Sequence, residues 1–331
     1  YLPLRIEAVP EGSIVPVSNV VCQVINTDPE FYWLPSYIET ALLRAIWYPS
    51  TVASVSYYCK GIIREALEKS ADTTDSLPFR LHDFGARGAS SFESVALGSL
   101  ANLVNFSGTD SMTALVAASR WYGMDKDMPA FSIPAAEHST MTAWGRDGET
   151  AAFANMIEQF GGKDKAFSVV SDSYDLWNAI DNIWGDALKE DVKNMGGTLV
   201  IRPDSGEPIK VVREALERLA VKFGTTINSK GYKVLPDYVR IIQGDGISAQ
   251  SLGKIIHAVM DAGFSAENIT FGTGGGLLQQ VNRDTMSWAM KASAISIVGA
   301  GKDIYKDPVT RNSQRTNKGR LALITESNGQ L

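Results

Sequence analysis

Residues 197–208 read Gly-Thr-Leu-Val-Ile-Arg-Pro-Asp-Ser-Gly-Glu-Pro, and this stretch decides the fold of the chain. Thr198 to Ile201 form a short apolar run entered from glycine, which predicts a buried strand. Arg202 and Asp204 follow it directly, so a guanidinium and a carboxylate would stand together at the strand end. That pair suits phosphate oxygens, ribose hydroxyls or hydrated Mg²⁺, although a surface turn with an Arg–Asp ion pair would fit the same residues. The choice depends on whether the pattern recurs.

The order of short apolar strand, polar rim and helix does recur, from about residue 79 onward. Such alternation predicts a parallel sheet, because strands that run in one direction need long crossover connections. Seven units, with Ala294–Val298 as a possible eighth strand, favour a (β/α) barrel over a doubly wound sheet, with its functional groups at the carboxyl ends of the strands. The seven expected strands are Phe79–Phe84, Leu103–Phe106, Phe131–Ile133, Phe167–Val170, Thr198–Ile201, Tyr238–Ile242 and Asn268–Phe271.

The segment before the first of these units has a different character. Residues 1 to about 29 alternate strand-like runs with turn residues, which predicts antiparallel, half-exposed strands. Helices are expected over about 32–48, where Pro49 ends the periodic run, and over about 51–69. The polar run 70–76 reads as a linker and as the first domain boundary.

Composition is that of a soluble globular protein, with 44% hydrophobic and 21% charged residues in a chain of 331. No apolar run approaches the roughly 20 residues of a membrane span. The net charge of −6 offers no global basic field to nucleic acid. Only two cysteines occur, Cys22 and Cys59, which fits a reducing cytoplasm better than a disulfide framework. No signal peptide is visible, and since the chain opens at Tyr1 we expect a preceding amino-terminal portion.

Of the three histidines, His138 lies where chemistry is expected. It follows an expected strand and precedes a helix, in the run 134–140, so it could be a nucleophile or an acid–base group. A polar cluster that caps the helix is the alternative. His257 lies within an expected helix and is assigned to the structure, and the role of His82, within an expected strand, stays open.

Carboxylates and an aromatic–arginine pair mark other strand ends. Asp110 either serves the site or caps a helix, and Asp172 and Asp175 either bind Mg²⁺ or cap a helix. Phe84 with Arg87 suits a flat heteroaromatic ring beside a phosphate. The alternative is a core phenylalanine and a surface arginine.

A glycine loop, residues 272–276, follows the last expected strand of the barrel. Its backbone N–H groups could approach a phosphate at a helix amino terminus, where barrels commonly bind phosphate. Gly244-Asp245-Gly246 could hold a ribose diol. The chain carries no Walker lysine motif, no paired cysteine ligands and no G-x-S-x-G elbow. The inventory therefore fits phosphoribosyl chemistry.

These motifs together resemble the type II phosphoribosyltransferase family, and within it the nicotinamide phosphoribosyltransferases. The resemblance runs in order from Tyr1 to about Leu323, and the set of motifs is highly specific. The motifs that carry it are His82-Asp-Phe-Gly-x-Arg-Gly88, Asn105-Phe-x-Gly-Thr-Asp110, Pro134-Ala-Ala-Glu-His-Ser-Thr140, Val169-Val-Ser-Asp-Ser-Tyr-Asp175, Ile201-Arg-Pro-Asp-Ser-Gly206, Gln243-Gly-Asp-Gly246 and Gly274-Gly-Gly-Leu-Leu-Gln279.

The resemblance implies that nicotinamide reacts with phosphoribosyl pyrophosphate to give nicotinamide mononucleotide and pyrophosphate for NAD salvage, with Mg²⁺ as cofactor and ATP as a coupling co-substrate. It implies an α/β fold in which an incomplete (β/α) barrel of about seven units packs on a β-rich α+β domain built from both chain ends. The catalytic barrel would span 79–280, and residues 1–78, with 281–331 returning to them, would form the other domain. A cytoplasmic homodimer with shared active sites is also implied.

The resemblance assigns the substrate contacts to residues of the rim. Phe84 would stack on the pyridine ring, and Asp110 would accept a hydrogen bond from the carboxamide. The other contacts are implied for Arg87 with pyrophosphate, Gly244 and Asp245 with ribose, Gly274 and Gly275 with the 5′-phosphate, and Arg283 and Lys291 from the partner subunit.

His138, Asp204 and Arg202 are the expected catalytic residues. The resemblance implies that ATP phosphorylates His138 to enhance turnover. Arg202 would contact base and phosphates, and Asp204 the ribosyl substrate or its Mg²⁺. Asp172 is expected to contact substrate and, with Asp204, to hold the metal directly or through water.

Three other functions compete with this one. Nicotinate phosphoribosyltransferase has the same fold and takes a different base. Another phosphate-binding barrel, such as an aldolase, would need a Schiff-base lysine at a strand end, and the sequence has none there. A non-enzymatic extracellular signalling protein would need secretion, against which the lack of a visible signal peptide argues.

Overall fold

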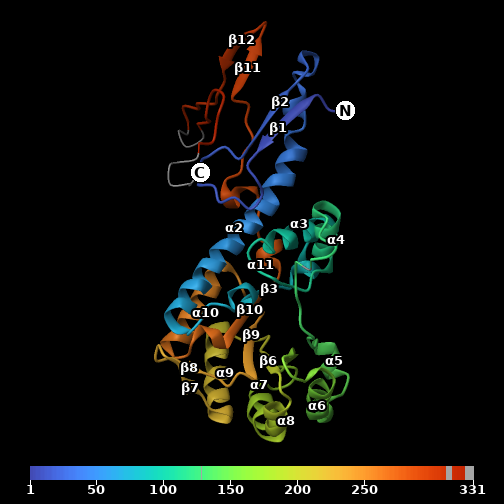
Figure 1. Ribbon diagram of the computed structural model, residues 1–331, viewed down its shortest axis with the longest axis vertical. Helices are drawn as coiled ribbons and strands as arrows, with labels where there is room; N and C mark the ends of the chain where they lie inside the picture. The colour runs from blue at the N-terminus through green and yellow to red at the C-terminus, as the bar shows by residue number, and fades with distance from the viewer. Residues whose placement is uncertain (128, 311–314, 325–331) are drawn as a thin grey trace. The chain divides into compact units, whose positions relative to one another are not determined.

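The computed structural model describes residues 1–127, 129–310 and 315–324. Contacts divide the chain into two units: unit 1 contains Tyr1–Trp47 and Arg283–Leu331, and unit 2 contains Tyr48–Asn282. The domain boundaries expected from the sequence lie near residues 78 and 280. In the structure the amino-terminal boundary between the units lies inside a long helix, α2 (Glu39–Ser70), which runs from one unit into the other (Figure 1).

Unit 1 is rich in β-structure drawn from both ends of the chain. β1 (Leu4–Ala8) pairs antiparallel with β2 (Cys22–Asn26), as expected for this segment, and β11 (Ala294–Ile297) pairs antiparallel with β12 (Ala300–Asp303). The prediction of an eighth barrel strand over Ala294–Val298 is therefore wrong. Val298 and Gly299 both take positive φ, which turns the chain into a hairpin. The short helical elements are η1 (Pro29–Phe31), α1 (Leu34–Tyr37) and η7 (Arg283–Met286).

The helix α2 is one element where the sequence predicts two. Pro49 lies inside it, so the prediction that this residue ends a helix is wrong. A proline in a helix interior removes a backbone donor and clashes with the preceding turn, which costs about 3 kcal/mol or more. Burial of an apolar stripe at helical spacing in unit 2 offsets this cost. The stripe comprises Val52, Cys59, Ile63 and Leu67.

Unit 2 is built on a six-stranded parallel sheet in the order β4-β3-β10-β9-β6-β5, which confirms the incomplete (β/α) barrel. Four strands match apolar runs of the sequence and are almost wholly buried, as expected where helices cover a parallel sheet. The strands are β3 (Leu81–Asp83), β4 (Gly108–Thr109), β5 (Ala166–Val170), β6 (Thr198–Arg202), β9 (Val239–Gln243) and β10 (Ile269–Thr273).

Two of the seven expected strands differ from the structure. Leu103–Phe106 is a turn that follows α3 (Phe92–Asn102), and the adjacent strand is β4, two residues further along the chain. Phe131–Ile133 forms no regular strand; instead Phe131 bridges to β4 and Ala135 bridges to β5. Residues 131–136 therefore cross the gap between the two edge strands of the sheet.

Helices of unit 2 bury apolar faces against the sheet. In α9 (Pro208–Phe223), Val212, Leu216 and Leu219 recur at helical spacing and are fully buried. No helix in the described ranges is long and apolar enough to span a bilayer. The other helices are α4 (Met112–Tyr122), α5 (His138–Thr142), α6 (Glu149–Phe160), α7 (Leu176–Asn178), the π-helix η5 (Ala179–Ala187), α8 (Lys189–Asn194), α10 (Ala249–Asp261) and α11 (Gly275–Leu278). Short elements are η2 (Leu77–Phe79), η3 (Gly85–Gly88), η4 (Arg146–Gly148), η6 (Ala266–Asn268), β7 (Thr226–Ile227) and β8 (Lys233–Val234).

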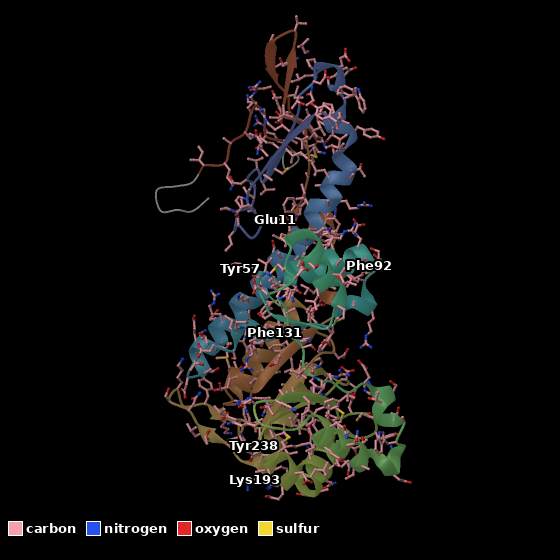
Figure 2. All side chains as sticks on the ribbon, turned by 45° about the vertical axis from the view of Figure 1, so that its right-hand side comes forward. Glu11, Tyr57, Phe92, Phe131, Lys193 and Tyr238 are labelled. Atoms are coloured by element: carbon pink, nitrogen blue, oxygen red, sulfur yellow. The ribbon has the colours of Figure 1, made fainter. Side chains whose placement is uncertain are left out.

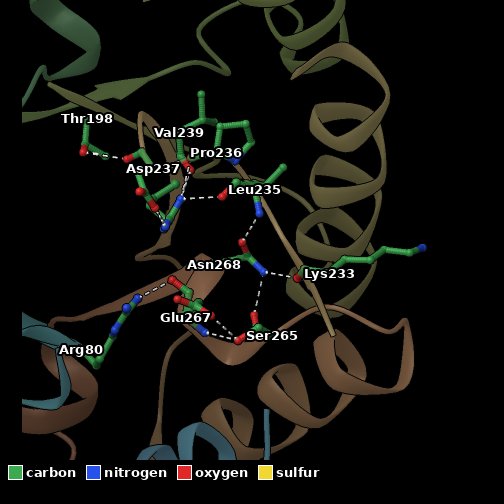
Figure 3. A network of polar contacts seen from close by, with 11 residues as sticks. Arg80, Thr198, Lys233, Leu235, Pro236, Asp237, Val239, Ser265, Glu267 and Asn268 are labelled. Carbon is green, nitrogen blue, oxygen red and sulfur yellow. Dashed lines mark hydrogen bonds and ion pairs between the residues drawn. The ribbon is translucent and has the colours of Figure 1, made fainter. Parts of the chain in front are cut away.

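A polar network holds the amino ends of the strands (Figure 3). Arg80, just before β3, donates from Nη1 to the backbone oxygen of Glu267 at 2.7 Å, and burial lowers the pKa of Arg80 to about 10. Asn268, just before β10, accepts from the backbone N–H of Leu235 at 2.8 Å and donates to the backbone oxygen of Ser265 at 2.8 Å. These contacts satisfy backbone groups between strands, so this end of the barrel is structural.

Candidate active site

Polar and aromatic groups gather at the carboxyl ends of the strands of unit 2. Because these ends share one edge of a parallel sheet, residues far apart in the sequence come together there. The residues that follow each strand are Phe84 and Arg87 after β3, Asp110 after β4, Glu137 and His138 after residues 131–136, Asp172 after β5, Arg202 and Asp204 at the end of β6, Gly244 and Asp245 after β9, and Gly274 and Gly275 after β10.

His138 opens α5 and is held between two aspartates. Its Nε2 lies 2.9 Å from Oδ1 of Asp172, and its Nδ1 lies 3.9 Å from Oδ2 of Asp204. The other oxygen of Asp172 accepts from the backbone N–H of Asp204 at 3.2 Å. A carboxylate only accepts, so Nε2 is the donor in the contact with Asp172. The Asp172 side chain is 5% exposed and the His138 side chain 40%, so a buried carboxylate orients an accessible imidazole.

Arg202 and Asp204 lie together at the end of β6, as the sequence predicts. Nη2 of Arg202 is 3.9 Å from Oδ2 of Asp204, and the arginine is buried. Its Nε has no hydrogen-bond partner among the described residues, which leaves a buried donor suited to an anionic ligand. Burial raises the pKa of Asp204, and the neighbouring Asp172 and Asp245 add to this rise, against the lowering by Arg202 and His138.

Glu137, to which the sequence analysis assigns no role, lies near both arginines of the site. Its Oε2 is 3.7 Å from Nη2 of Arg202, and its Oε1 is 3.9 Å from Nη1 of Arg87. It also caps α5 in a reciprocal pair with Thr140. Ion pairs of this length are loose, so both guanidinium groups stay available for a stronger anion. Its position as an N-cap directly before His138 is the sequence feature that could have indicated it.

The ring of Phe84 lies over two glycines. A Cβ atom on Gly272 would lie 2.0 Å from Cε2 of Phe84, and one on Gly244 would lie 3.2 Å from the same atom. The backbone N–H of Phe84 donates to the oxygen of Thr273 at 2.8 Å, which fixes the residue against β10. Gly272, expected in the glycine loop 272–276, lies instead within β10 and makes room for this ring. A glycine within an apolar strand marks a close approach, and that feature could have found it.

Asp110 is held by two donors. Nε2 of His82 lies 2.8 Å from its Oδ1, and the hydroxyl of Ser132 donates to the same oxygen. Ser111 occupies the N-cap position of α4, so the structure does not support Asp110 as the helix cap. Burial raises the pKa of Asp110, but the hydrogen bond and charge of His82, with Ser132 and Arg202, outweigh it and hold this pKa below its ordinary value. The group is therefore a stable carboxylate.

The two aspartates of the 171–175 run have different functions. Asp175 accepts from the backbone N–H groups of Trp177 and Asn178 and caps α7, which confirms the capping alternative for this residue. Asp172 points to His138 instead, as described above.

Gly274 and Gly275 form the turn from β10 into α11. A Cβ on Gly275 would meet no heavy atom of the described chain within 4 Å, and a Cβ on Gly88 would lie 3.6 Å from Gly275. This open space fits close approach of a ligand phosphate to the backbone. Asp245 is exposed on the neighbouring loop, where its backbone oxygen accepts from Nε2 of Gln243 at 2.9 Å.

Arg283 and Lys291 belong to unit 1. Nη2 of Arg283 is 2.8 Å from Oδ1 of Asp284, and Nζ of Lys291 is 3.8 Å from Oε1 of Glu39. Their expected contact with substrate from a partner subunit stays a prediction.

In the described part of the chain, no group of three or more His, Cys, Asp or Glu side chains is arranged to hold a metal ion. Both oxygens of Asp172 accept hydrogen bonds within the protein, whereas the Asp204 side chain is 25% exposed. Asp204 is therefore the better placed of the two expected ligands. A Mg²⁺ ion here would take most of its ligands from substrate phosphates and water.

Residues 79–329 match the nicotinate phosphoribosyltransferase (NAPRTase) family. The chain is 50% identical over 326 residues to a nicotinamide phosphoribosyltransferase of Xanthomonas campestris pv. campestris, which covers 98% of this chain and 69% of the relative. It is 33% identical over 346 residues to a nicotinamide phosphoribosyltransferase of Acinetobacter baylyi, which covers 99% of this chain and 68% of the relative.

The fold resembles the crystal structure of nicotinate-nucleotide pyrophosphorylase from Pyrococcus furiosus, with a TM-score of 0.55 and 18% sequence identity. The likeness covers 84% of this chain and spans 58% of the length of that structure. At this identity it concerns the fold alone, and the sequence matches supply the family. The chain therefore belongs to the nicotinate phosphoribosyltransferase (NAPRTase) family, a family of pentosyltransferases.

Proposed function

We propose that this chain transfers the phosphoribosyl group of phosphoribosyl pyrophosphate to nicotinamide, giving nicotinamide mononucleotide and pyrophosphate, a step of NAD salvage. The observation that carries the proposal is the Asp110 carboxylate, whose partner His82 lies 5.1 Å from the ring of Phe84, centroid to centroid. A carboxylate beside an aromatic ring suits an amide donor on a flat heteroaromatic base. The two relatives described above, both named nicotinamide phosphoribosyltransferase, support the same base.

The chemistry needs no strong base. The pyridine nitrogen already holds a lone pair, so it forms the new C–N bond to the ribose while the C–O bond to pyrophosphate breaks. Positive charge develops on the sugar, and negative charge on the leaving group. Arg202 and Arg87 would bind the departing pyrophosphate, and Asp204 would stabilise the cationic sugar. The loose contacts of both arginines with Glu137 support this assignment.

Mg²⁺ is the proposed cofactor, with Asp204 as the residue expected to hold it, directly or through water, and Asp172 as the second. When bound, the ion would neutralise charge on the pyrophosphate. The exposure of Asp204 and its position beside Arg202 support this assignment.

We also propose that ATP phosphorylates His138 and thereby enhances turnover. The contact with Asp172 supports this role, because it fixes the tautomer of the ring and leaves the Nδ1 lone pair as the nucleophile. A histidine that only capped the helix would not need a hydrogen bond to a buried carboxylate.

A cytoplasmic homodimer with shared active sites is the proposed form of the protein, with Arg283 and Lys291 reaching the partner's site. Phe92 on α3 is a large apolar side chain that is exposed (Figure 2), and Met112 on α4 is exposed as well. Exposed apolar side chains are a property of subunit interfaces. Cys22 and Cys59 are both free thiols, in keeping with a reducing compartment.

The deciding experiment is product analysis. Purified protein is incubated with phosphoribosyl pyrophosphate, Mg²⁺ and either nicotinamide or nicotinate, with and without ATP. The nucleotide products are separated by chromatography and identified by mass spectrometry. We expect nicotinamide mononucleotide and a higher kcat/KM for nicotinamide. Preference for nicotinate would support the alternative, nicotinate phosphoribosyltransferase, which the family name favours. No product from either base would contradict phosphoribosyl transfer by this chain.

A further inference from the structure

We propose that His82 and Ser132 are positioning residues for the base: together they hold Oδ1 of Asp110 and leave Oδ2 to accept from the carboxamide of nicotinamide. The inference rests on the proposed function and adds the residues that set its choice of base. Neither His82 nor Ser132 carries a role in the sequence analysis.

Both donors converge on a single oxygen. Nε2 of His82 lies 2.8 Å from Oδ1 of Asp110, and the Ser132 hydroxyl donates to that same Oδ1. A carboxylate oxygen accepts about two hydrogen bonds, so Oδ1 is saturated. Among the residues that the structure describes, no donor is recorded on Oδ2. The carboxylate is therefore fixed in orientation with one oxygen engaged and one free.

The ring of His82 is itself held in place. A Cβ on Gly108 would lie 2.5 Å from Nδ1 of His82, so a larger residue at that position would displace the ring. The rings of His82 and Phe84 are 5.1 Å apart and tilted by 52°. The His82 side chain is 14% exposed, so neighbouring groups confine it on most sides. The position of the ring between β3 and β4 thus aims Nε2 at Asp110.

Ser132 reaches Asp110 from the segment that crosses the gap in the sheet. Phe131, its neighbour, bridges to Gly108 of β4, which brings the serine beside the end of that strand. We call Asp110, His82 and Ser132 the relay. Its three residues therefore come from three adjacent segments of the barrel wall. Asp110 is 43% exposed, yet two donors hold it, an arrangement that a solvated surface carboxylate does not need.

This relay has a direct consequence for base selection. The free oxygen of Asp110 can accept the amide N–H of nicotinamide. Nicotinate would present a carboxylate to a carboxylate, and such juxtaposition of like charges is penalised. The penalty requires that Asp110 stays ionised and cannot swing away, and His82 and Ser132 secure both conditions. Loss of either donor should relax the rejection of nicotinate and weaken the hold on nicotinamide.

The test compares His82→Leu and Ser132→Ala with the conservative His82→Gln, whose amide can donate from the position of Nε2. Binding of nicotinamide and of nicotinate is measured by titration calorimetry, and kcat/KM is measured for both bases. We expect the ratio of nicotinamide to nicotinate affinity to fall by roughly tenfold in His82→Leu and Ser132→Ala, since each loses a hydrogen bond to a charged group. His82→Gln should restore most of the ratio, which a purely structural histidine would not.

The matched control is His257→Leu, on the exposed face of α10, which should leave the ratio unchanged. Thermal unfolding is measured for every variant, and Ser132, being exposed, tests the relay even if His82→Leu unfolds. An unchanged affinity ratio in folded Ser132→Ala and His82→Leu would overturn the inference. The binding measurement is independent of turnover. Selective binding without product would therefore retain the relay and contradict the transfer reaction, and a wild type that binds neither base would contradict both.

Discussion

Nε2 of His138 lies 2.9 Å from Oδ1 of Asp172, and the aspartate is almost buried whereas the histidine is not. A buried acceptor behind an accessible imidazole fixes which ring nitrogen carries the proton and which way the ring faces. Asp172 also accepts from the backbone of Asp204, so one carboxylate couples the histidine to the end of β6.

Asp172→Asn should impair the proposed ATP step without unfolding the protein. The amide is close in size, but it offers a donor and only one acceptor, so the His138 tautomer is no longer enforced. We expect ATP hydrolysis to fall by about tenfold or more.

His138→Ala should abolish ATP hydrolysis and the ATP-dependent gain in turnover while slower transfer continues. His257→Ala is the control, and undiminished hydrolysis in His138→Ala would refute the assignment.

Arg202→Ala should remove a charge-assisted contact to phosphate. Losing such a contact costs roughly 1.5–3 kcal/mol, or about ten- to hundredfold in kcat/KM. Arg202→Lys should recover part of it, since a lysine keeps the charge without the planar fork. Steady-state kinetics and thermal unfolding are measured together. If the variant unfolds while its folded fraction retains full activity, the residue is structural.

Gly272→Ala should displace the ring of Phe84, because its Cβ would lie 2.0 Å from Cε2. Overpacking of this kind costs about 1–3 kcal/mol, so the free energy of unfolding should fall by that amount. The KM for nicotinamide should rise as well. Gly61→Ala, in α2, is the control: its Cβ meets no heavy atom of the described chain within 4 Å, and a helical alanine should stabilise by roughly 0.5–1 kcal/mol. Equal behaviour of the two variants would contradict the proposed ring support.

Asp110→Asn should narrow the preference for nicotinamide over nicotinate. The neutral amide removes the repulsion of the nicotinate carboxylate, so the gain should appear mainly in kcat/KM for nicotinate. Only the direction is predicted, since Arg202 lowers the negative potential near this group. Both bases are assayed in wild type and variant. An unchanged ratio would remove Asp110 from base selection, and a wild type that prefers nicotinate would sink the amide assignment.

Glu149, at the start of α6, should make stability depend on pH. It is buried, its Oε1 has no hydrogen-bond partner in the described ranges, and burial raises its pKa against the opposing charge of Arg146. A carboxyl group with a raised folded pKa stabilises the fold fully below its unfolded pKa of about 4.3, and this contribution is lost as pH rises through the folded pKa. Glu149→Gln should therefore raise the free energy of unfolding at pH 7 but not at pH 4. Denaturant titrations at both values measure it, and an equal effect at both would contradict it.

Much of the barrel is readable from the sequence because four of its strands contain short apolar runs, such as Leu199–Ile201. Predictions of helices and strands from the sequence fail where the local pattern and the long-range packing favour different structures. Pro49 has the local properties of a helix end, but the stripe beginning at Val52 is buried in unit 2 and keeps the helix intact. Leu103–Phe106 has the composition of a strand, but hydrogen bonds to the end of α3 make it a turn.

The site shows the same division. Arg202, Asp204 and His138 could be predicted because each follows a strand, and parallel strands bring their carboxyl ends together. This reasoning could not predict the roles of His82, Gly272 and Ser132, because those roles depend on distances to residues from other strands. A glycine in a strand or a serine in a loop has many ordinary explanations until its neighbours are known.

Residues 131–136 connect two parts of the candidate site. They act as a seam: Phe131 hydrogen-bonds β4 on one side, and Ala136 hydrogen-bonds β5 on the other, without the regular ladder that joins the remaining strands. Ser132 lies on this seam and His138 directly follows it. Ser132, proposed to position Asp110 for the base, and His138, proposed to receive the phosphoryl group, thus depend on one segment that only isolated bridges hold to the sheet. A displacement of this segment would therefore move both residues together.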